Sequence, residues 1–291
     1  MKPVVVGIGE VLWDVYPDGV RLGGAPANFA CQSAAQGVES WIVSAVGADQ
    51  LGDRAVEDLR ARGARVEIAR DRERPTGRVN VALDAAGSPT FEIAPEVAWD
   101  HIPWTTAVES LARRADAVCF GTLAQRSPDS RETISRFLRA ARPSALRMCD
   151  VNLRQRFYDA ATIVRSLELA SGLKLNEDEL PIVALACGIR EESTVATLRA
   201  LMRRLELRIV ALTRGAAGAI LIAGDEESVE LAPHVTVVDT VGAGDAFTAT
   251  LVCDLLAGVP LAEINRHANA VAAYVCSQPG AMAVRAHETI L

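Results

Sequence analysis

One short segment in the C-terminal part of the chain combines glycines with two aspartates, in the run Asp239-Thr240-Val241-Gly242-Ala243-Gly244-Asp245. It follows the apolar run 235–238 and precedes a predicted helix over residues 246–256. Glycines let the backbone approach a ligand, and successive N–H groups beside a helix N-terminus attract phosphate oxygens. Asp245 could merely cap the helix, but the adjacent glycine turn favours a role as a proton acceptor. The helix terminus is expected to keep Asp245 ionised.

Polar residues that suit a polyhydroxyl ligand lie near the N-terminus. Asp14 follows the first predicted strand, residues 4–9, and open α/β sheets bind ligands at the carboxyl ends of their strands. The turn Gly23-Gly24-Ala25-Pro26-Ala27-Asn28 enters the next helix, and Asn28 carries both a donor and an acceptor. A plain cap or turn role for Asn28 is the open alternative.

Two further strand ends carry candidate residues. Asn176 and Glu179, three positions apart after the predicted strand 173–175, can both face the strand end, where hydrated Mg²⁺ could be held. Lys174 lies inside that strand, and Lys2 is the only other lysine of the chain. A place near a phosphate and a mere accident of codon history explain Lys174 equally well. The run 213–218, with Thr213, Gly215 and Gly218, is a weaker candidate for cradling part of a nucleotide.

Several classes of protein are excluded by pattern and charge. The chain has no Walker-type phosphate loop, and Gly7-Ile8-Gly9 lacks the third glycine of a dinucleotide fingerprint. The net charge is 30 − 37 = −7 over 291 residues, without basic blocks, which argues against a nucleic-acid partner. No apolar run is long enough to span a membrane, and the N-terminus does not resemble a signal peptide. Six scattered cysteines fit neither a zinc site nor a disulfide framework, so we expect a cytoplasmic protein.

The elements that must position these residues alternate between strands and helices. Short, continuously apolar runs are typical of strands covered on both faces, and their alternation with amphipathic stretches predicts a three-layer α/β fold with a mostly parallel sheet. The predicted strands are 4–9, 41–46, 117–120, 146–151, 173–175 and 208–212, and the predicted helices include 52–61, 131–141, 194–205 and 246–256. Two hairpins are also predicted, one of strands 78–83 and 89–93 and one of strands 219–222 and 229–231.

Taken together and in this order, the segments resemble the ribokinase family of sugar kinases, also called the phosphofructokinase B family. The resemblance covers essentially the whole chain, and the run from Asp239 to Asp245 is its most specific part. The other segments that carry it are 23–28, 46–52, Pro75-Thr76-Gly77 before the first hairpin, Asp150-Val151-Asn152-Leu153-Arg154, 176–179, 213–218 and 269–281.

This resemblance implies a single kinase domain over residues 1–291. The implied fold is a three-layer α/β/α core with nine strands, together with a small β lid from about 12–24 and 74–98 that often serves for homodimerisation. The implied roles are Asp245 as catalytic base; Gly242, Ala243 and Gly244 at the anion hole; Asp14, Gly24, Asn28 and Arg154 for the sugar; Asn176, Thr213, Gly215, Gly218 and Asn269 for ATP; Glu179 for Mg²⁺ through water; and Asp239 for a monovalent cation such as K⁺.

Within the family, Ala25-Pro26 and the run 75–84 are more like fructokinases than ribokinases. The expected reaction is therefore ATP-dependent phosphorylation of fructose, with sugar and ATP as the only partners besides a second copy. A 2-keto-3-deoxygluconate kinase, a ribokinase and a nucleoside kinase are the alternatives, and an acidic sugar would need an arginine such as Arg126 or Arg154. A non-catalytic sugar- or nucleotide-binding regulator is the alternative from a different class, although the intact Asp245 and glycine run speak against it.

Overall fold

A nine-stranded sheet forms the centre of the computed structural model, which describes residues 2–16, 19–83 and 89–283. In this part of the chain the strands pair in parallel, except for the last two at one edge, which are antiparallel. In spatial order the strands are β13 (Glu226–Glu230), β12 (Ala219–Ala223), β11 (Ile209–Thr213), β10 (Gly172–Asn176), β9 (Leu146–Asp150), β8 (Ala117–Phe120), β1 (Val4–Ile8), β4 (Glu39–Gly47) and β5 (Arg65–Asp71). The predicted mostly parallel α/β fold is confirmed.

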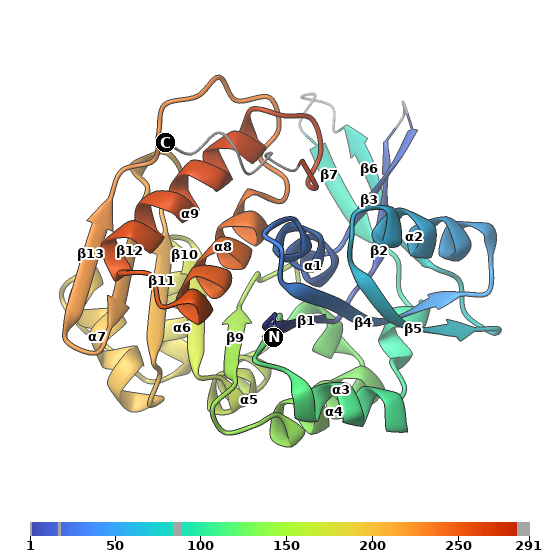
Figure 1. Ribbon diagram of the computed structural model, residues 1–291, viewed down its shortest axis with the longest axis horizontal. Helices are drawn as coiled ribbons and strands as arrows, with labels where there is room; N and C mark the ends of the chain where they lie inside the picture. The colour runs from blue at the N-terminus through green and yellow to red at the C-terminus, as the bar shows by residue number, and fades with distance from the viewer. Residues whose placement is uncertain (1, 17–18, 84–88, 284–291) are drawn as a thin grey trace.

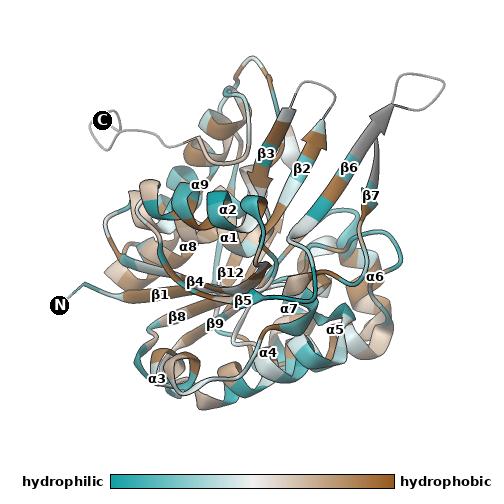
Figure 2. Cartoon of the chain, turned by 90° about the vertical axis from the view of Figure 1, so that its right-hand side faces the viewer, coloured by the Kyte–Doolittle hydropathy of each residue, from teal (hydrophilic) through white to brown (hydrophobic). Residues whose placement is uncertain are grey.

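Helices cover both faces of this sheet and complete the three layers visible in Figure 2. On one face lie α1 (Ala25–Ala35), α2 (Gln50–Ala61), α8 (Ala243–Ala257) and α9 (Leu261–Cys276). On the other face lie α3 (Thr106–Arg114), α4 (Pro128–Ala140), α5 (Ala160–Leu169), α6 (Glu179–Ala186) and α7 (Thr194–Arg204).

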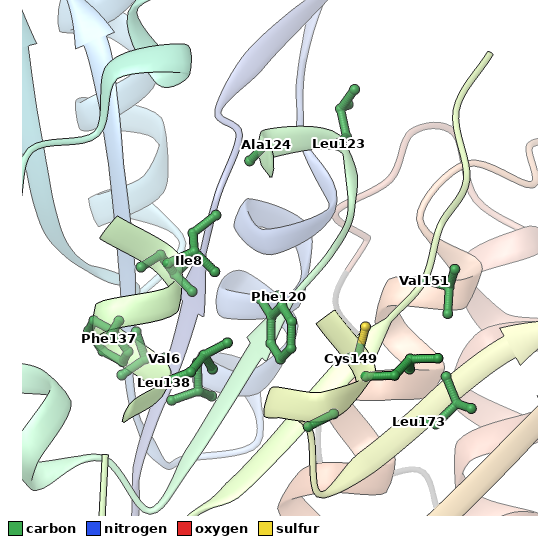
Figure 3. Packing of buried hydrophobic residues seen from close by; sticks show 14 of the residues in the cluster. Val6, Ile8, Phe120, Leu123, Ala124, Phe137, Leu138, Cys149, Val151 and Leu173 are labelled. Atoms are coloured by element: carbon green, nitrogen blue, oxygen red, sulfur yellow. The ribbon is translucent and has the colours of Figure 1, made fainter. Parts of the chain in front are cut away.

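The strands are apolar throughout because each face meets a helical layer. In β1, Val6 and Ile8 pack into the cluster of α3 to α7, whereas Val5 packs into the cluster that contains α8 and α9. Figure 3 shows the first cluster, with Phe137 of α4 beside Val6 and Ile8, and Phe120 close by. Burial on both faces of a parallel sheet therefore explains the continuous apolar runs of the sequence.

A smaller four-stranded sheet stands beside the core, where Figures 1 and 2 show it projecting from the main body. Its order is β3 (Gly19–Gly23), β2 (Leu12–Tyr16), β6 (Gly77–Leu83) and β7 (Pro89–Ile93). β2 begins four residues after the end of β1, so the small sheet is joined to the carboxyl end of a central core strand. The first predicted hairpin is β6 and β7, and its predicted turn, 84–88, lies outside the described residues.

Some predicted element boundaries are wrong. The second strand of the other hairpin begins at Glu226 rather than at 229, because Ala223 pairs with Glu226 across a two-residue turn. α8 begins at Ala243 rather than at 246, because Gly242 adopts a left-handed φ of 81° and caps the helix. The edge strand β5 was not among the predicted strands, since its alternating charged residues hide the apolar pattern.

The segment after α9 returns across the molecule to the first two helices. Ala281 and Met282 are buried in the cluster that also holds residues of α1, α2 and β4. Gln32 donates a hydrogen bond to the carbonyl of Ala283 at 2.8 Å, and Arg62 donates to the carbonyl of Met282 at 3.2 Å.

All six cysteines are unpaired and five are buried. Within the described ranges, no helix is both long and apolar enough to cross a membrane.

Candidate active site

Asp245 meets a residue from the far end of the chain. It lies in the first turn of α8, and Asn28 of α1 donates its side-chain amide to Asp245 Oδ2 at 2.7 Å. The N–H groups at the start of α8 have no acceptor within the helix, so Gly244 and Asp245 present backbone donors beside this carboxylate. The N–H of Ala243 lies beside them and makes a long hydrogen bond of 3.4 Å to the carbonyl of Thr240. The structure thus brings together a proton acceptor, an anion-binding turn and a side chain from the Gly23–Asn28 turn.

The surroundings of Asp245 shift its ionisation. Burial raises the pKa of Asp245 to about 6, and the nearby Asp150 also raises it. The hydrogen bond from Asn28 and the charges of Lys174 and Arg154 lower that pKa again. The sequence predicts an ionised Asp245 from the helix terminus alone, whereas here burial works against ionisation. With a pKa below neutrality, the carboxylate is still mostly ionised at pH 7 and can accept a proton.

A buried ion pair lies under this turn. Lys174 Nζ is 3.1 Å from Asp150 Oδ1, and Thr248 donates its hydroxyl to Asp150 Oδ2 at 2.8 Å. Burial lowers the pKa of Lys174, but Asp150, Glu179 and Asp245 together raise it above its ordinary value, so the ammonium is charged. Each charge of this pair therefore has a partner, as buried charges require.

The predicted sugar residues gather around the end of β1. Gly24 caps α1, and its carbonyl accepts a hydrogen bond from the N–H of Asn28 at 2.9 Å. Asp14 is half-buried on β2; burial raises its pKa to about 6, and the positive charge of Arg154 lowers it. Arg154 is exposed, and its charge also affects Asp245. Asn28 thus contacts Asp245 directly, and the positive charge of Arg154 acts on both Asp245 and Asp14.

Glu10 belongs to the same group, although it is absent from the predicted site residues. It is 3% exposed, and its Oε1 accepts a hydrogen bond from the N–H of Ala25 at 3.3 Å. Among the described residues, no hydrogen-bond partner reaches Glu10 Oε2 or Asn28 Oδ1, both of which are buried. Burial raises the pKa of Glu10 to about 7, and the charge of Asp245 contributes to that rise.

Asn176 and Glu179 form a reciprocal cap at the start of α6. Asn176 Oδ1 accepts a hydrogen bond from the N–H of Glu179, and Glu179 Oε2 accepts one from the N–H of Asn176, both at 2.9 Å. Glu179 Oε1 accepts a third bond from the N–H of Leu153 at 2.8 Å. Glu179 thus ties the end of β10 to the segment that carries Arg154. Burial, followed by the charge of Asp150, raises the pKa of Glu179.

The predicted nucleotide residues are more dispersed. Thr213 ends β11, Gly215 is exposed in the turn that follows, and Gly218 is buried just before β12. Asn269 is 5% exposed and donates its side-chain amide to Asn265, one turn earlier in α9. Contact of these residues with a nucleotide stays a prediction.

Asp239 joins the two segments predicted for a monovalent cation. Its Oδ1 accepts a hydrogen bond from the N–H of Val241 at 3.0 Å, and its Oδ2 accepts one from the N–H of Gly280 at 3.1 Å. The turn before α8 and the loop after α9 therefore lie together. Within the described ranges, no three carboxylate, histidine or cysteine side chains converge as a metal site.

Arg126 does not serve as a free arginine for an acidic sugar. It forms two hydrogen bonds of 2.8 Å with the carboxylate of Asp100 and donates to the carbonyl of Ala94 at 2.6 Å. Its guanidinium lies 4.0 Å from the ring centre of Trp99 and 4.8 Å from that of Phe157. Of the two arginines named for an acidic sugar, Arg126 is therefore the less suited, because Asp100 already balances its charge.

Three polar residues of this site were not predicted to act there: Glu10, Asp150 and Thr248. Asp150 lies in β9, where the other polar residue is Arg147, and Lys174 lies in β10, where the other polar residue is Asn176. A charge in such a mostly apolar core strand requires a buried partner. That requirement is a signal from which their pairing could have been inferred.

Comparisons with known proteins agree with this geometry. A family model described as pfkB family carbohydrate kinase matches residues 18–288. A sugar kinase of Pyrococcus horikoshii is 29% identical over 308 residues, covering 99% of this chain and 94% of its own length. Its crystal structure in complex with ATP has a TM-score of 0.81, covering 96% of this chain and 94% of that chain at 29% identity.

Two further relatives act on different acceptors, according to their names. A fructokinase of Klebsiella pneumoniae is 30% identical over 272 residues, which cover 87% of this chain and 85% of the relative. The crystal structure of aminoimidazole riboside kinase from Salmonella enterica, with aminoimidazole riboside and an ATP analog, has a TM-score of 0.79 at 27% identity. It covers 97% of this chain and 96% of that chain.

Proposed function

This chain belongs to the pfkB family of carbohydrate kinases, and from this premise we propose that it transfers the terminal phosphoryl group of ATP to a hydroxyl of fructose. Sugar kinase activity follows from membership of the family, and the fructose acceptor is the proposal. The contact between Asn28 and Asp245 carries it, because this contact sets a proton acceptor against the turn 23–28, which resembles the sugar site of fructokinases.

In the proposed reaction, Asp245 accepts the proton of the sugar hydroxyl while the hydroxyl oxygen attacks the terminal phosphorus in line. Asn28 orients the Asp245 carboxylate, and Asp14 and Arg154 hold the sugar. The amides of Ala243, Gly244 and Asp245 stabilise negative charge on the transferring group. Positioning and electrostatics of this kind supply most of the acceleration in phosphoryl transfer.

Magnesium fits this site as an ion held mainly by the nucleotide. Each carboxylate oxygen of Glu179 accepts one backbone N–H and retains a lone pair for a metal-bound water. When bound, Mg²⁺ would neutralise charge on the phosphates. The nucleotide itself is proposed to lie along the strand ends that carry Asn176, Thr213, Gly215 and Gly218, with Asn269 on the adenine side.

Three further assignments belong to the proposal. Asp239, with carbonyls near Val241 and Gly280, is proposed as a K⁺ site because its carboxylate joins these two segments. The four-stranded sheet is proposed as a lid that also forms a homodimer. A cytoplasmic location is proposed on the unpaired state of the six cysteines.

Arg154 favours a second acceptor. It is exposed, its positive charge acts on Asp14, and it is one of the two arginines named for an acidic sugar, the other being Arg126. With Arg126 neutralised by Asp100, Arg154 is the residue that could bind the carboxylate of 2-keto-3-deoxygluconate. Ribose and nucleosides are the remaining acceptors to compare.

The test is release of ADP from MgATP with fructose, 2-keto-3-deoxygluconate, ribose, adenosine and aminoimidazole riboside, each with and without K⁺. We expect the highest kcat/KM with fructose. On the acid side kcat should fall around pH 6, where Asp245 becomes protonated. A higher kcat/KM for any other acceptor would overturn the fructose assignment, and turnover with none of the five would refute this acceptor class.

A further inference from the structure

Lys174 and Asp150 meet directly beneath the start of α8. Lys174 is 6% exposed and Asp150 is 4% exposed, because they lie on the neighbouring core strands β10 and β9. Thr248 connects the pair to the helix, since its hydroxyl donates to Asp150 and also contacts the carbonyl of Gly244, at 2.8 and 2.9 Å. The pair therefore contacts the anion-binding turn and not only the interior of the sheet.

Gly244 is the residue that admits the ammonium group to this position. A Cβ at residue 244 would lie only 2.9 Å from Lys174 Nζ. Gly244 lies within α8 and has no positive φ, so its conformation does not require glycine. A side chain here would push the ammonium group away from the turn.

Stability alone gives no reason for a charged pair here. Transfer of two charges out of water costs free energy that their attraction barely repays, and apolar residues of similar volume are often at least as stable. An ammonium beside the first turn of α8 does, however, act on the negative charges that the reaction needs. Opposite charges at such separations favour the ionised carboxylate, and like charges disfavour it.

The charged groups around Asp245 come from several elements. Acidic groups are Asp150 on β9 and Glu10 after β1; the thiol of Cys119 on β8 is neutral, because burial, Asp150 and Asp245 raise its pKa. Basic groups are Lys174 on β10 and Arg154 in the loop after β9. Of the two basic groups, only Lys174 is buried and fixed by an ion pair.

We propose that Lys174 is a positioning residue of the transfer site: Asp150 fixes its ammonium under Gly244, where it keeps Asp245 ionised and holds the anion-binding turn. Lys174 acts through Asp245 and Gly244, and Asp150 acts in two ways, by fixing Lys174 and by opposing it with its own charge. This inference rests on the proposed function only for the identity of Asp245 as the base.

The first experiment measures the pKa of Asp245 without any substrate, by ¹³C NMR of aspartate carboxyl groups, with the resonance assigned by its loss in Asp245→Asn. Lys174→Met removes a positive charge and should raise this pKa by about one unit, whereas Asp150→Asn removes a negative charge and should lower it by about one unit. Lys2→Met makes the same chemical change at an exposed position and should leave the pKa unchanged.

The opposite signs separate the proposal from a purely structural pair. A pair that only supports packing would leave the pKa unchanged or move it in the same direction in both variants, and either outcome overturns the proposal. If Lys174→Met does not fold, the pKa of Asp245 in Asp150→Asn and in the neutral double variant Lys174→Met/Asp150→Asn tests the proposal instead. The double variant should return the pKa to within about half a unit of the wild-type value.

The second experiment measures kcat and the KM for ATP with the best acceptor. Lys174→Met should lower kcat about 10- to 100-fold at pH 7. The one-unit rise in the pKa of Asp245 accounts for only about twofold of this loss at pH 7, and the displaced anion-binding turn accounts for the rest. The acid limb of the pH profile should be displaced upward, and the KM for ATP should stay within about twofold. An equal loss at every pH would overturn the proposal. If the wild-type chain phosphorylates no sugar, the proposed function fails, while the NMR comparison still tests the charge arrangement.

Discussion

The two sides of Asp245 are built in contrasting ways. On the acceptor side, defined by Glu10, Asp14, Asn28 and Arg154, two of the four polar side chains are only 3% exposed and bond to helix α1 or to Asp245. On the proposed nucleotide side Gly218 and Asn269 are buried, but Gly215 is exposed. The segment before Asp239 lies beside the end of α9, the helix of Asn269, because Val238 donates its N–H to the carbonyl of Cys276 at 2.8 Å. In that segment Val237 and Val238 are 61% and 60% exposed.

This difference shows which side of the site is fixed in place before its ligand binds and which side is not. Burial of polar groups on the acceptor side costs free energy during folding, which leaves them fixed in place before a ligand arrives. The nucleotide side instead leaves apolar surface uncovered, so a ligand must supply the burial itself. Substitutions on the acceptor side should therefore change turnover and stability, whereas those on the nucleotide side should change affinity alone.

The largest expected effect tests the residue at which both sides meet. Asp245→Asn keeps the shape but removes the proton acceptor, so kcat should fall about 10²- to 10⁴-fold. Binding of ATP should survive, because the backbone amides of α8 remain. Steady-state kinetics and calorimetric titration with ATP measure the two quantities. Asp225→Asn, in the exposed turn between β12 and β13, is the matched control, and near-normal turnover of Asp245→Asn would refute its role as base.

The second substitution tests whether the buried ion pair of Arg126 and Asp100, next to the small sheet, stabilises the fold. Arg126→Met leaves Asp100 buried without its partner, next to the end of β7. Removal of one member of a buried pair typically costs about 3–5 kcal/mol in the free energy of unfolding. Urea denaturation measures this loss. Arg199→Met breaks the more exposed ion pair with Glu227 and should lower the free energy of unfolding by less than about 1 kcal/mol. Similar losses for both variants would contradict a larger contribution of the buried pair to stability.

The buried carboxyl of Glu10 predicts a dependence of stability on pH. Its pKa is raised to about 7 from 4.5, so the stability that it contributes is complete below pH 4.5 and is lost as pH rises through 7. This loss amounts to about 3 kcal/mol. Glu10→Gln cannot ionise, so its free energy of unfolding should change correspondingly less between pH 5 and 8. Unfolding curves at several pH values measure this, and parallel pH profiles for both proteins would exclude a buried, neutral Glu10.

The smallest expected effect lies on the nucleotide side. Val238→Ser removes an exposed apolar side chain just before Asp239, so the KM for ATP should rise about two- to fivefold, while kcat and the free energy of unfolding stay within error. Val229→Ser, at an exposed position of β13, controls for a general loss of surface apolarity. An unchanged KM for ATP would place the nucleotide elsewhere.

Much of the fold could be predicted from the sequence because its signals are local. The strand 117–120 was predicted with its observed ends, since burial on both faces leaves an uninterrupted apolar run. β5 could not be recognised, because one edge of a sheet tolerates charged residues. The helix α8 was predicted to begin at 246, after a glycine turn, whereas it begins at Ala243, because a glycine such as Gly242 is more often a sign of a helix end than of a start.

Individual site residues could be predicted better than their partners. Asn176 and Glu179 are three positions apart, and their reciprocal cap is a local arrangement. The contact between Asn28 and Asp245 joins residues 217 positions apart, so it depends on how α1 and α8 pack. The role of Arg126 was left open in the sequence for the same reason, since a free arginine and one paired with Asp100 look alike in a sequence.

The return of the chain after α9 has a consequence for synthesis on the ribosome. Ala281 and Met282 complete the apolar cluster of α1 and α2, yet they are translated 220 and 221 residues after the end of α2. During most of translation the nascent N-terminal half therefore exposes an apolar surface that its own sequence cannot cover. We expect this surface to be the region of the nascent chain on which chaperones act longest.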